Sequence, residues 1–195
     1  RLVLETLRSP GAWLLAIAFG CYAGQWMSVM GFLPTFYGGE GIAPAMAGFL
    51  TAVGALINVS GNFASGLLLQ RGMPAGRLVL TASLTMLICA WCLFGSDLPF
   101  AVRYAALLAF SAVGGLIPGT LFALTHRFTP SPAAISTTTG LMQQGSSIGQ
   151  FLLPPLVALV VSGSGGWSSA WLATGTLALI NVALALVLLR WRRRG

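Results

Sequence analysis

Six long apolar runs divide this chain, and shorter segments rich in glycine, proline and arginine separate them. The runs cover residues 13–35, 45–69, 78–94, 100–124, 133–161 and 167–189. A hydrocarbon core of about 30 Å needs about 20 helical residues to cross it, and each run meets or approaches that length. The pattern therefore predicts an all-α polytopic membrane protein, a six-transmembrane-helix bundle that occupies residues 1–195 as a single membrane domain.

Glycine and proline mark points where these helices should bend or approach one another. Segment 114–119 (GGLIPG) lies inside the fourth run. Its proline removes a backbone hydrogen bond and its glycines relax the turn, so we expect that helix to bend. Pro34 and the pair Pro154 and Pro155 interrupt the first and fifth runs. Glycine pairs four residues apart allow close backbone approach, and they occur at Gly20/Gly24, Gly115/Gly119 and Gly145/Gly149.

The charged residues are distributed unevenly between alternate loops. All ten basic residues are arginines, and nine of them lie before the first run or just after the second, fourth and sixth. The opposite loops hold Glu40 and Asp97. Because cytoplasmic loops retain arginine whereas translocated loops do not, we expect both termini on the cytoplasmic side. The tail cluster of Arg190, Arg192, Arg193 and Arg194 is typical of contact with anionic lipid rather than nucleic acid.

Polar side chains follow one helical face in three of the runs. The second run carries Asn58 and Asn62, the fifth carries Gln143 and Ser147, and the first carries Gln25. An amide in hydrocarbon needs a hydrogen-bond partner, so these faces should point into the bundle or into a wet cavity. Asn58 and Gln143 fit helix-to-helix bonding and cavity lining equally well, whereas helix-to-helix bonding is favoured for the others.

The interior of the runs is almost free of ionisable groups. No run contains an Asp or Glu away from its ends, so this chain offers no intramembrane carboxylate as a proton carrier. Arg103 lies a few residues inside the outer end of the fourth run. We expect its long side chain to reach outward toward Asp97. An anionic substrate would be implied if it faced the cavity instead.

The sequence gives little support to redox, metal or hydrolytic chemistry. Cys89 and Cys92 have C-x-x-C spacing but lie in an apolar helix, so with Cys21 they are interpreted as packing residues rather than a redox pair. One histidine and three scattered acids supply no metal-ligand set, and we expect no cofactor. An intramembrane serine hydrolase using Ser65 and His126 is one alternative, although no G-x-S-G surrounds Ser65. A channel, a permease subunit of an ATP-driven importer, and a membrane scaffold or receptor are the others.

Several motifs resemble those of the major facilitator superfamily. Segment 66–72 (GLLLQRG) with Arg77 resembles its cytoplasmic signature, although Gln70 stands where an acidic residue is common. Segment 145–150 (GSSIGQ) is similar to a glycine-rich stretch in the fifth helix of each bundle, but lacks the usual proline after the second glycine. Segments 24–34 and 143–145 with Asn58 look most like the branch of bacterial cyanate and nitroimidazole transporters. The likeness is to a C-terminal six-helix bundle and covers nearly the whole chain.

This resemblance implies half of a twelve-helix transporter, built from two inverted three-helix repeats. The N-terminal six-helix bundle of the same protein would be its partner in a bacterial cytoplasmic (inner) membrane. The first, second, fourth and fifth helices would surround the path, and the third and sixth, which are the least polar here, could face lipid. We therefore expect transport of a small solute by alternating access, without enzymatic activity. The predicted substrate-binding residues are Gln25, Asn58, Asn62, Gln143, Ser147 and Arg103. Because the first residue is arginine, we expect a segment of a longer protein.

Overall fold

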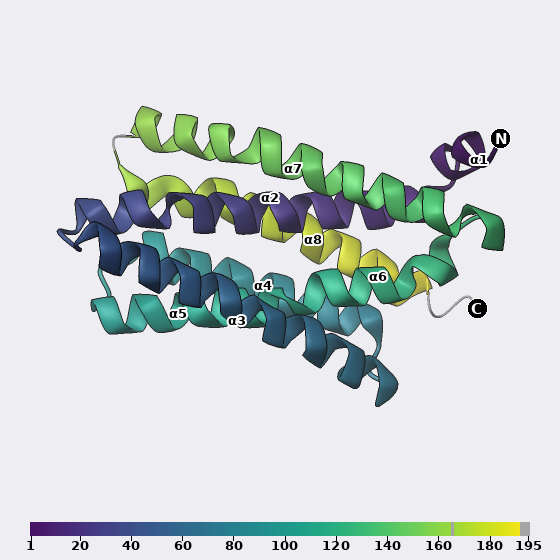
Figure 1. Ribbon diagram of the computed structural model, residues 1–195, viewed down its shortest axis with the longest axis horizontal. Helices are drawn as coiled ribbons and strands as arrows, with labels where there is room; N and C mark the ends of the chain where they lie inside the picture. Colours follow the sequence, from purple (N-terminus) through teal and green to yellow (C-terminus); the bar gives the residue numbers. More distant parts are fainter. Residues whose placement is uncertain (165, 192–195) are drawn as a thin grey trace.

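The computed structural model describes residues 1–164 and 166–191, and this part of the chain is almost entirely helical (Figure 1). The long helices are α2 (Pro10–Gly39), α3 (Pro44–Gln70), α4 (Ala75–Phe94), α5 (Phe100–Gly114), α6 (Leu116–Phe128), α7 (Ile135–Ser164) and α8 (Ala170–Trp191). A short helix α1 (Leu2–Leu7) precedes them, and single turns η1 (Pro132–Ala134) and η2 (Trp167–Ser169) lead into α7 and α8. With α5 and α6 forming one span, six spans are long and apolar enough to cross a membrane. The predicted all-α six-helix fold is confirmed.

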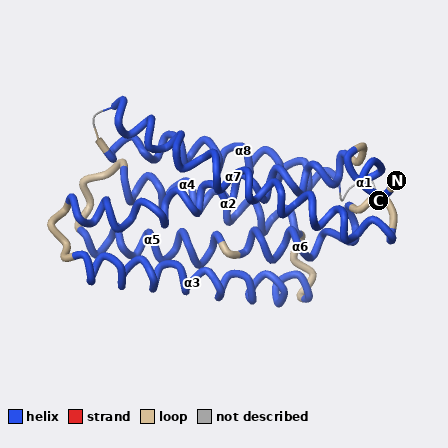
Figure 2. Tube along the Cα trace, turned by 45° about the horizontal axis from the view of Figure 1, so that its top comes forward, coloured by secondary structure: helices blue, strands red, loops and turns tan. Residues whose placement is uncertain are grey.

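The spans run up and down along one axis, so their connections gather at two ends (Figures 1 and 2). One end holds α1, the α3–α4 loop, the α6–α7 loop and the end of α8. We call it the arginine-rich end, because Arg8, Arg71, Arg77, Arg127 and Arg190 lie there. The opposite end holds the α2–α3, α4–α5 and α7–α8 connections. The tail arginines Arg192, Arg193 and Arg194 lie outside the described residues.

Burial differs strongly between the spans. In α2, 72% of the most apolar stretch is buried within the bundle, whereas the value is 17% for α3 and for α7. Helix α2 therefore forms the centre, while α3 and α7 lie on the two flanks (Figure 1). Large apolar side chains such as Phe63 of α3 and Phe151 of α7 stay exposed. Those two helices leave broad faces open to lipid or to another bundle.

Glycine permits the close packing of α2 against α7. A Cβ atom added at Gly20 would lie 2.7 Å from the carbonyl oxygen of Gly145. A Cβ atom at Gly149 would overlap the carbonyl oxygen of Gly20, and one at Gly24 would lie 2.8 Å from the carbonyl oxygen of Gly149. These positions have room for backbone only. The close approach predicted from the glycine pairs of the first and fifth runs is confirmed.

The fourth span bends where segment 114–119 predicted it. Helix α5 ends at Gly114 and α6 begins at Leu116, so Pro118 falls in the first turn of α6, where a missing backbone N–H is tolerated. Helix α3 crosses at this break: a Cβ atom at Gly61 would lie 2.8 Å from the Cα atom of Gly115. By contrast, α2 and α7 continue through their internal prolines without a break.

Helix α8 packs against α4 and α2, and a buried amide fixes it to the centre of the bundle. Asn181 is fully buried. In the amide orientation that satisfies both groups, its Nδ2 lies 3.2 Å from the carbonyl oxygen of Ala18 and its Oδ1 lies 3.3 Å from the backbone nitrogen of Tyr22. These two backbone groups are four residues apart in α2. The prediction that the sixth span faces lipid therefore applies only to its outer side, where Leu179 is exposed.

Candidate functional site

A hollow of about 270 Å³ lies between α2, α3, α6 and α7, near the middle of the bundle. These elements belong to the first, second, fourth and fifth spans. We call it the four-helix hollow. Its lining residues are Phe19, Tyr22, Ala23 and Trp26 of α2, Asn58 and Asn62 of α3, Pro118 of α6, and Ser146 and Gln150 of α7.

Asn58 is the centre of a hydrogen-bond network on one wall of the hollow. Its Nδ2 donates to the carbonyl oxygen of Ser111 at 2.8 Å and lies 3.0 Å from the Tyr22 hydroxyl. The same hydroxyl is 3.2 Å from Asn58 Oδ1, which also accepts from Asn62 Nδ2 at 3.1 Å. Trp26 Nε1 donates to Ser111 Oγ at 3.3 Å. The network therefore joins α2, α3 and α5 across the centre of the bundle.

Both interpretations left open for Asn58 can be compared with this network. Its amide is hydrogen-bonded to two neighbouring helices, as expected of a residue that holds helices together in an apolar medium. It is also only half buried and lines the hollow. Because its partners hold it in place, the amide is presented to the hollow with little freedom to rotate. Asn58 therefore both bonds neighbouring helices and lines the hollow.

The α7 wall carries a second polar strip. Gln150 Nε2 donates to Ser146 Oγ at 2.9 Å, and both residues line the hollow. Ser147 and Gln143 are exposed and lie three and seven residues before Gln150, on the same face of α7. They extend this strip toward the arginine-rich end without lining the hollow itself.

Gln25 lies in the centre of α2 but does not line the hollow. Its side chain is fully buried, and neither Oε1 nor Nε2 has a hydrogen-bond partner among the described residues. A buried amide without partners costs about 1–3 kcal/mol, so such a residue points to a function or to a second conformation.

Arg103 is held at the opposite end of the bundle, at the start of α5. Its guanidinium forms an ion pair with Glu40, with Nη2 2.5 Å from Oε1 and 2.6 Å from Oε2, and it lies 5.4 Å from the centre of the Phe36 ring. The outward direction was predicted correctly, but the expected partner Asp97 was wrong. An edge-to-face contact between Tyr37 and Phe100, with ring centres 5.6 Å apart, brings the end of α2 and its cap residue Glu40 beside α5.

Other reactive groups form no site in the described part of the chain. Ser65 Oγ donates to the carbonyl oxygen of Asn62 at 2.7 Å, which gives no support to a nucleophile paired with His126. Among the residues described, no three His, Cys, Asp or Glu side chains come together as metal ligands. Cys21, Cys89 and Cys92 are free thiols.

The sequence prediction missed the aromatic wall. Tyr22 and Trp26 are four residues apart in α2, so both face the hollow. An indole near the middle of a span, rather than at the membrane interface, was the available signal, because its N–H needs a partner inside the bundle.

Comparison with known proteins identifies one family that resembles this chain. A search of the curated proteins found no match. The model of the Major Facilitator Superfamily, a family of transporters, matches residues 14–195. The match runs from the first turns of α2 through all six candidate membrane spans. A match over nearly the whole chain, on a six-helix bundle with a polar hollow between its first, second, fourth and fifth spans, shows that the chain belongs to the major facilitator superfamily.

Proposed function

We propose that this chain is one half of a small-solute transporter that works by alternating access, with the four-helix hollow as its share of the substrate site. The observation that carries the proposal is the convergence of polar and aromatic side chains from three helices, α2, α3 and α7, near the middle of an otherwise apolar bundle. Substrate sites of such transporters lie near the midplane, between two bundles.

The missing half would be the N-terminal six-helix bundle of the same protein, which we place against α3 and α7. Those two helices are the least buried of the six spans. The exposed strip of Gln143 and Ser147 on α7 would then face the partner rather than lipid, where exposed amides are costly. Rocking of the two bundles about this shared surface would open the hollow to each side in turn.

The lining of the hollow favours an uncharged solute that accepts and donates hydrogen bonds. None of its nine lining residues is charged. Asn58, Asn62 and Gln150 supply amides, and Trp26 supplies a ring face for stacking. In our proposal, Gln143 and Ser147 contact the solute on its way in, and Gln25 does so in a second conformation. Arg103 instead ties the α2–α3 loop to α5. The cyanate and nitroimidazole branch stays a prediction.

We further propose a bacterial cytoplasmic membrane with both termini inside, on the basis of the arginine asymmetry. In a variant whose cysteines, Cys21, Cys89 and Cys92 among them, are all replaced by serine, a new cysteine at Gly39 or Asp97 should react with a membrane-impermeant maleimide on intact cells. One at Met73, in the α3–α4 loop, should react only after permeabilisation. Equal labelling of Gly39 and Met73 on intact cells would contradict this topology.

Uptake by the purified protein tests the function itself. The full-length protein in proteoliposomes, offered labelled cyanate, a labelled nitroimidazole and a panel of small neutral solutes, should show saturable uptake and counterflow of at least one. The isolated 195-residue chain should show none, because half of the site is missing. Uptake that neither saturates nor exchanges would favour a channel, and specific uptake by the isolated chain as a monomer would overturn the two-bundle proposal.

A further inference from the structure

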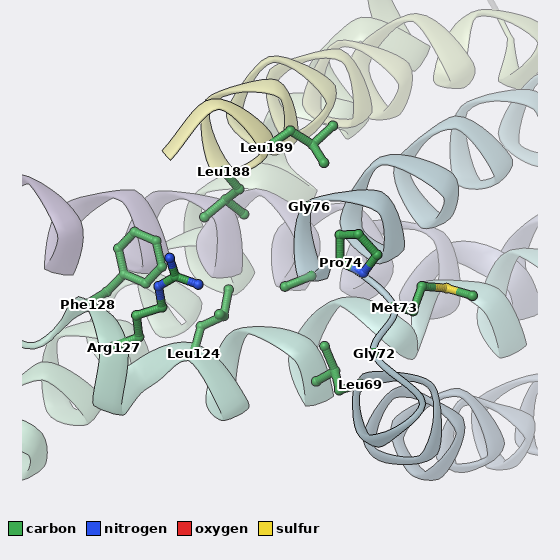
Figure 3. Close-up of a pocket in the computed structure, with 11 residues that line it drawn as sticks. Leu69, Gly72, Met73, Pro74, Gly76, Leu124, Arg127, Phe128, Leu188 and Leu189 are labelled. Atoms are coloured by element: carbon green, nitrogen blue, oxygen red, sulfur yellow. The ribbon is translucent and has the colours of Figure 1, made fainter. Parts of the chain in front are cut away.

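A second hollow, of about 220 Å³, opens at the arginine-rich end of the bundle (Figure 3). It lies where the α3–α4 loop, the first turn of α4, and the last turns of α6 and α8 meet. Leu69, Leu124, Leu188 and Leu189 supply apolar walls, and Arg127 contributes its guanidinium (Figure 3). We call it the terminal hollow. None of the residues of the four-helix hollow takes part in it.

Positively charged residues gather near the terminal hollow. Arg127 is exposed, and the ion pair of Arg103 at the opposite end is the one found among the described residues. Three further arginines directly adjoin lining residues in the chain: Arg71 precedes Gly72, Arg77 follows Gly76 and Arg190 follows Leu189. In the described part of the chain none of these four arginines forms an ion pair, and such a local excess of positive charge favours an anionic ligand.

The shape of the terminal hollow depends on glycine. Gly72 has φ +81°, in the left-handed region that glycine tolerates best, and it ends the turn after α3. Gly76 brings α4 against α8, since a Cβ atom there would lie 2.9 Å from the backbone nitrogen of Leu189. The first turn of α4 therefore packs directly on the backbone and side chain of Leu189, and the hollow stays open beside this contact.

Polarity changes along the hollow in the order that a phospholipid requires. Arg127 lies in the last turn of α6, at the level of the helix ends, where the membrane interface would be. Leu124 lies one turn deeper in α6, beside Leu188 of α8. A phospholipid likewise carries its phosphate at the interface and its acyl chains below. A soluble anion would use only the charged upper part.

We propose that the terminal hollow binds one anionic phospholipid, whose phosphate accepts hydrogen bonds from the Arg127 guanidinium. Its acyl chain packs on Leu124 and Leu188. Guanidinium and phosphate match in geometry, because two parallel N–H groups can reach two oxygens. The inference rests on membrane insertion, which the family membership shows, and needs neither transport nor a particular orientation.

Lipid binding to the full-length protein in detergent tests the proposal. Native mass spectrometry during titration with phosphatidylglycerol should show one tightest-binding copy, which phosphatidylcholine does not replace. Arg127→Gln should weaken that first copy about fivefold or more, since one arginine near anionic lipid contributes about 1 kcal/mol. Arg8→Gln is the matched control, because it removes the same charge at the same end, outside the hollow. It should change the affinity by less than about twofold.

A second variant keeps the charge and removes the space. Met73 is exposed in the α3–α4 loop and lines the hollow, so Met73→Trp should partly fill it and weaken the same first copy. Inorganic phosphate and glycerol 3-phosphate at millimolar concentration should not displace the lipid. The proposal is overturned if Arg127→Gln and Arg8→Gln lose equal affinity, if Met73→Trp binds as the parent does, or if free phosphate competes.

Discussion

Replacing Gly149 with alanine should lower the free energy of unfolding by about 1–3 kcal/mol, the usual cost of inserting a group into a filled interior. The new methyl group would overlap the carbonyl oxygen of Gly20 and lie 2.9 Å from its carbonyl carbon. These are backbone atoms of the central helix α2, so no side chain can rotate away to relieve the contact. Helices α2 and α7 must move apart.

Gly140→Ala provides a control in the same helix. Nothing lies within 4 Å of a Cβ atom added at Gly140, and alanine is the better helix former, so this variant should be unchanged or more stable by up to about 1 kcal/mol. Tryptophan-fluorescence melting of both purified full-length variants in the same detergent measures the difference. Equal melting temperatures would show that the α2–α7 contact is looser than the structure indicates.

The architecture was largely predictable because crossing a membrane imposes few solutions. Backbone groups in hydrocarbon must bond within the segment, so apolar runs of this length become helices. The bend at segment 114–119 was predictable because its cause is local: proline removes a backbone hydrogen bond and the neighbouring glycines allow the turn to relax. Helix α1 was not predicted, because six residues are too few to show a helical period. It is positioned by a contact that is distant in sequence, from Thr6 Oγ1 to Thr137 Oγ1 at 3.1 Å.

The site was predicted less completely. The helical period shows which residues share a face of a helix, but not which helix packs against that face. Asn58 and Asn62 both line the hollow, although helix-to-helix bonding was favoured for Asn62, whereas Gln25, equally polar, is buried without lining it. The partner of Arg103 depended on an aromatic contact between the end of α2 and the start of α5. The partners of Asn181 could not be predicted from the sequence either, because they are backbone groups and every helix has such groups.

Asn181 also shows how a span with few polar groups can influence the hollow. Its amide contacts the backbone nitrogen of Tyr22, and the Tyr22 hydroxyl contacts Asn58. Tyr22 of α2 therefore links Asn181 of α8 to Asn58 of α3, through its backbone at one end and its hydroxyl at the other. Because the Tyr22 backbone is held from one side and its hydroxyl from the other, the aromatic wall of the hollow has little freedom to move relative to Asn58.

Asn58→Leu should reduce uptake by the full-length protein by roughly tenfold or more, the effect of losing about 1.4 kcal/mol of substrate binding. It should also lower stability. The substitution leaves the Tyr22 hydroxyl and the Asn62 amide without their common partner, which costs between about 0.6 kcal/mol, typical of bonds between membrane helices, and about 3 kcal/mol. Asn58 thus couples the fold to the site, and the variant should show both losses in initial uptake rate and in melting temperature.

Gln143→Leu separates the two effects. Gln143 lies outside the network around Asn58, on the strip that we propose faces the solute path, so leucine there removes no bond of that network and should leave the melting temperature within about 1 °C of the parent. If the strip faces the solute as we propose, uptake should still fall severalfold. Full uptake by Gln143→Leu would show that the part of α7 that precedes Ser146 and Gln150 does not belong to the site. Full uptake by Asn58→Leu, together with a lower melting temperature, would show that the network only holds helices together and that the solute binds elsewhere.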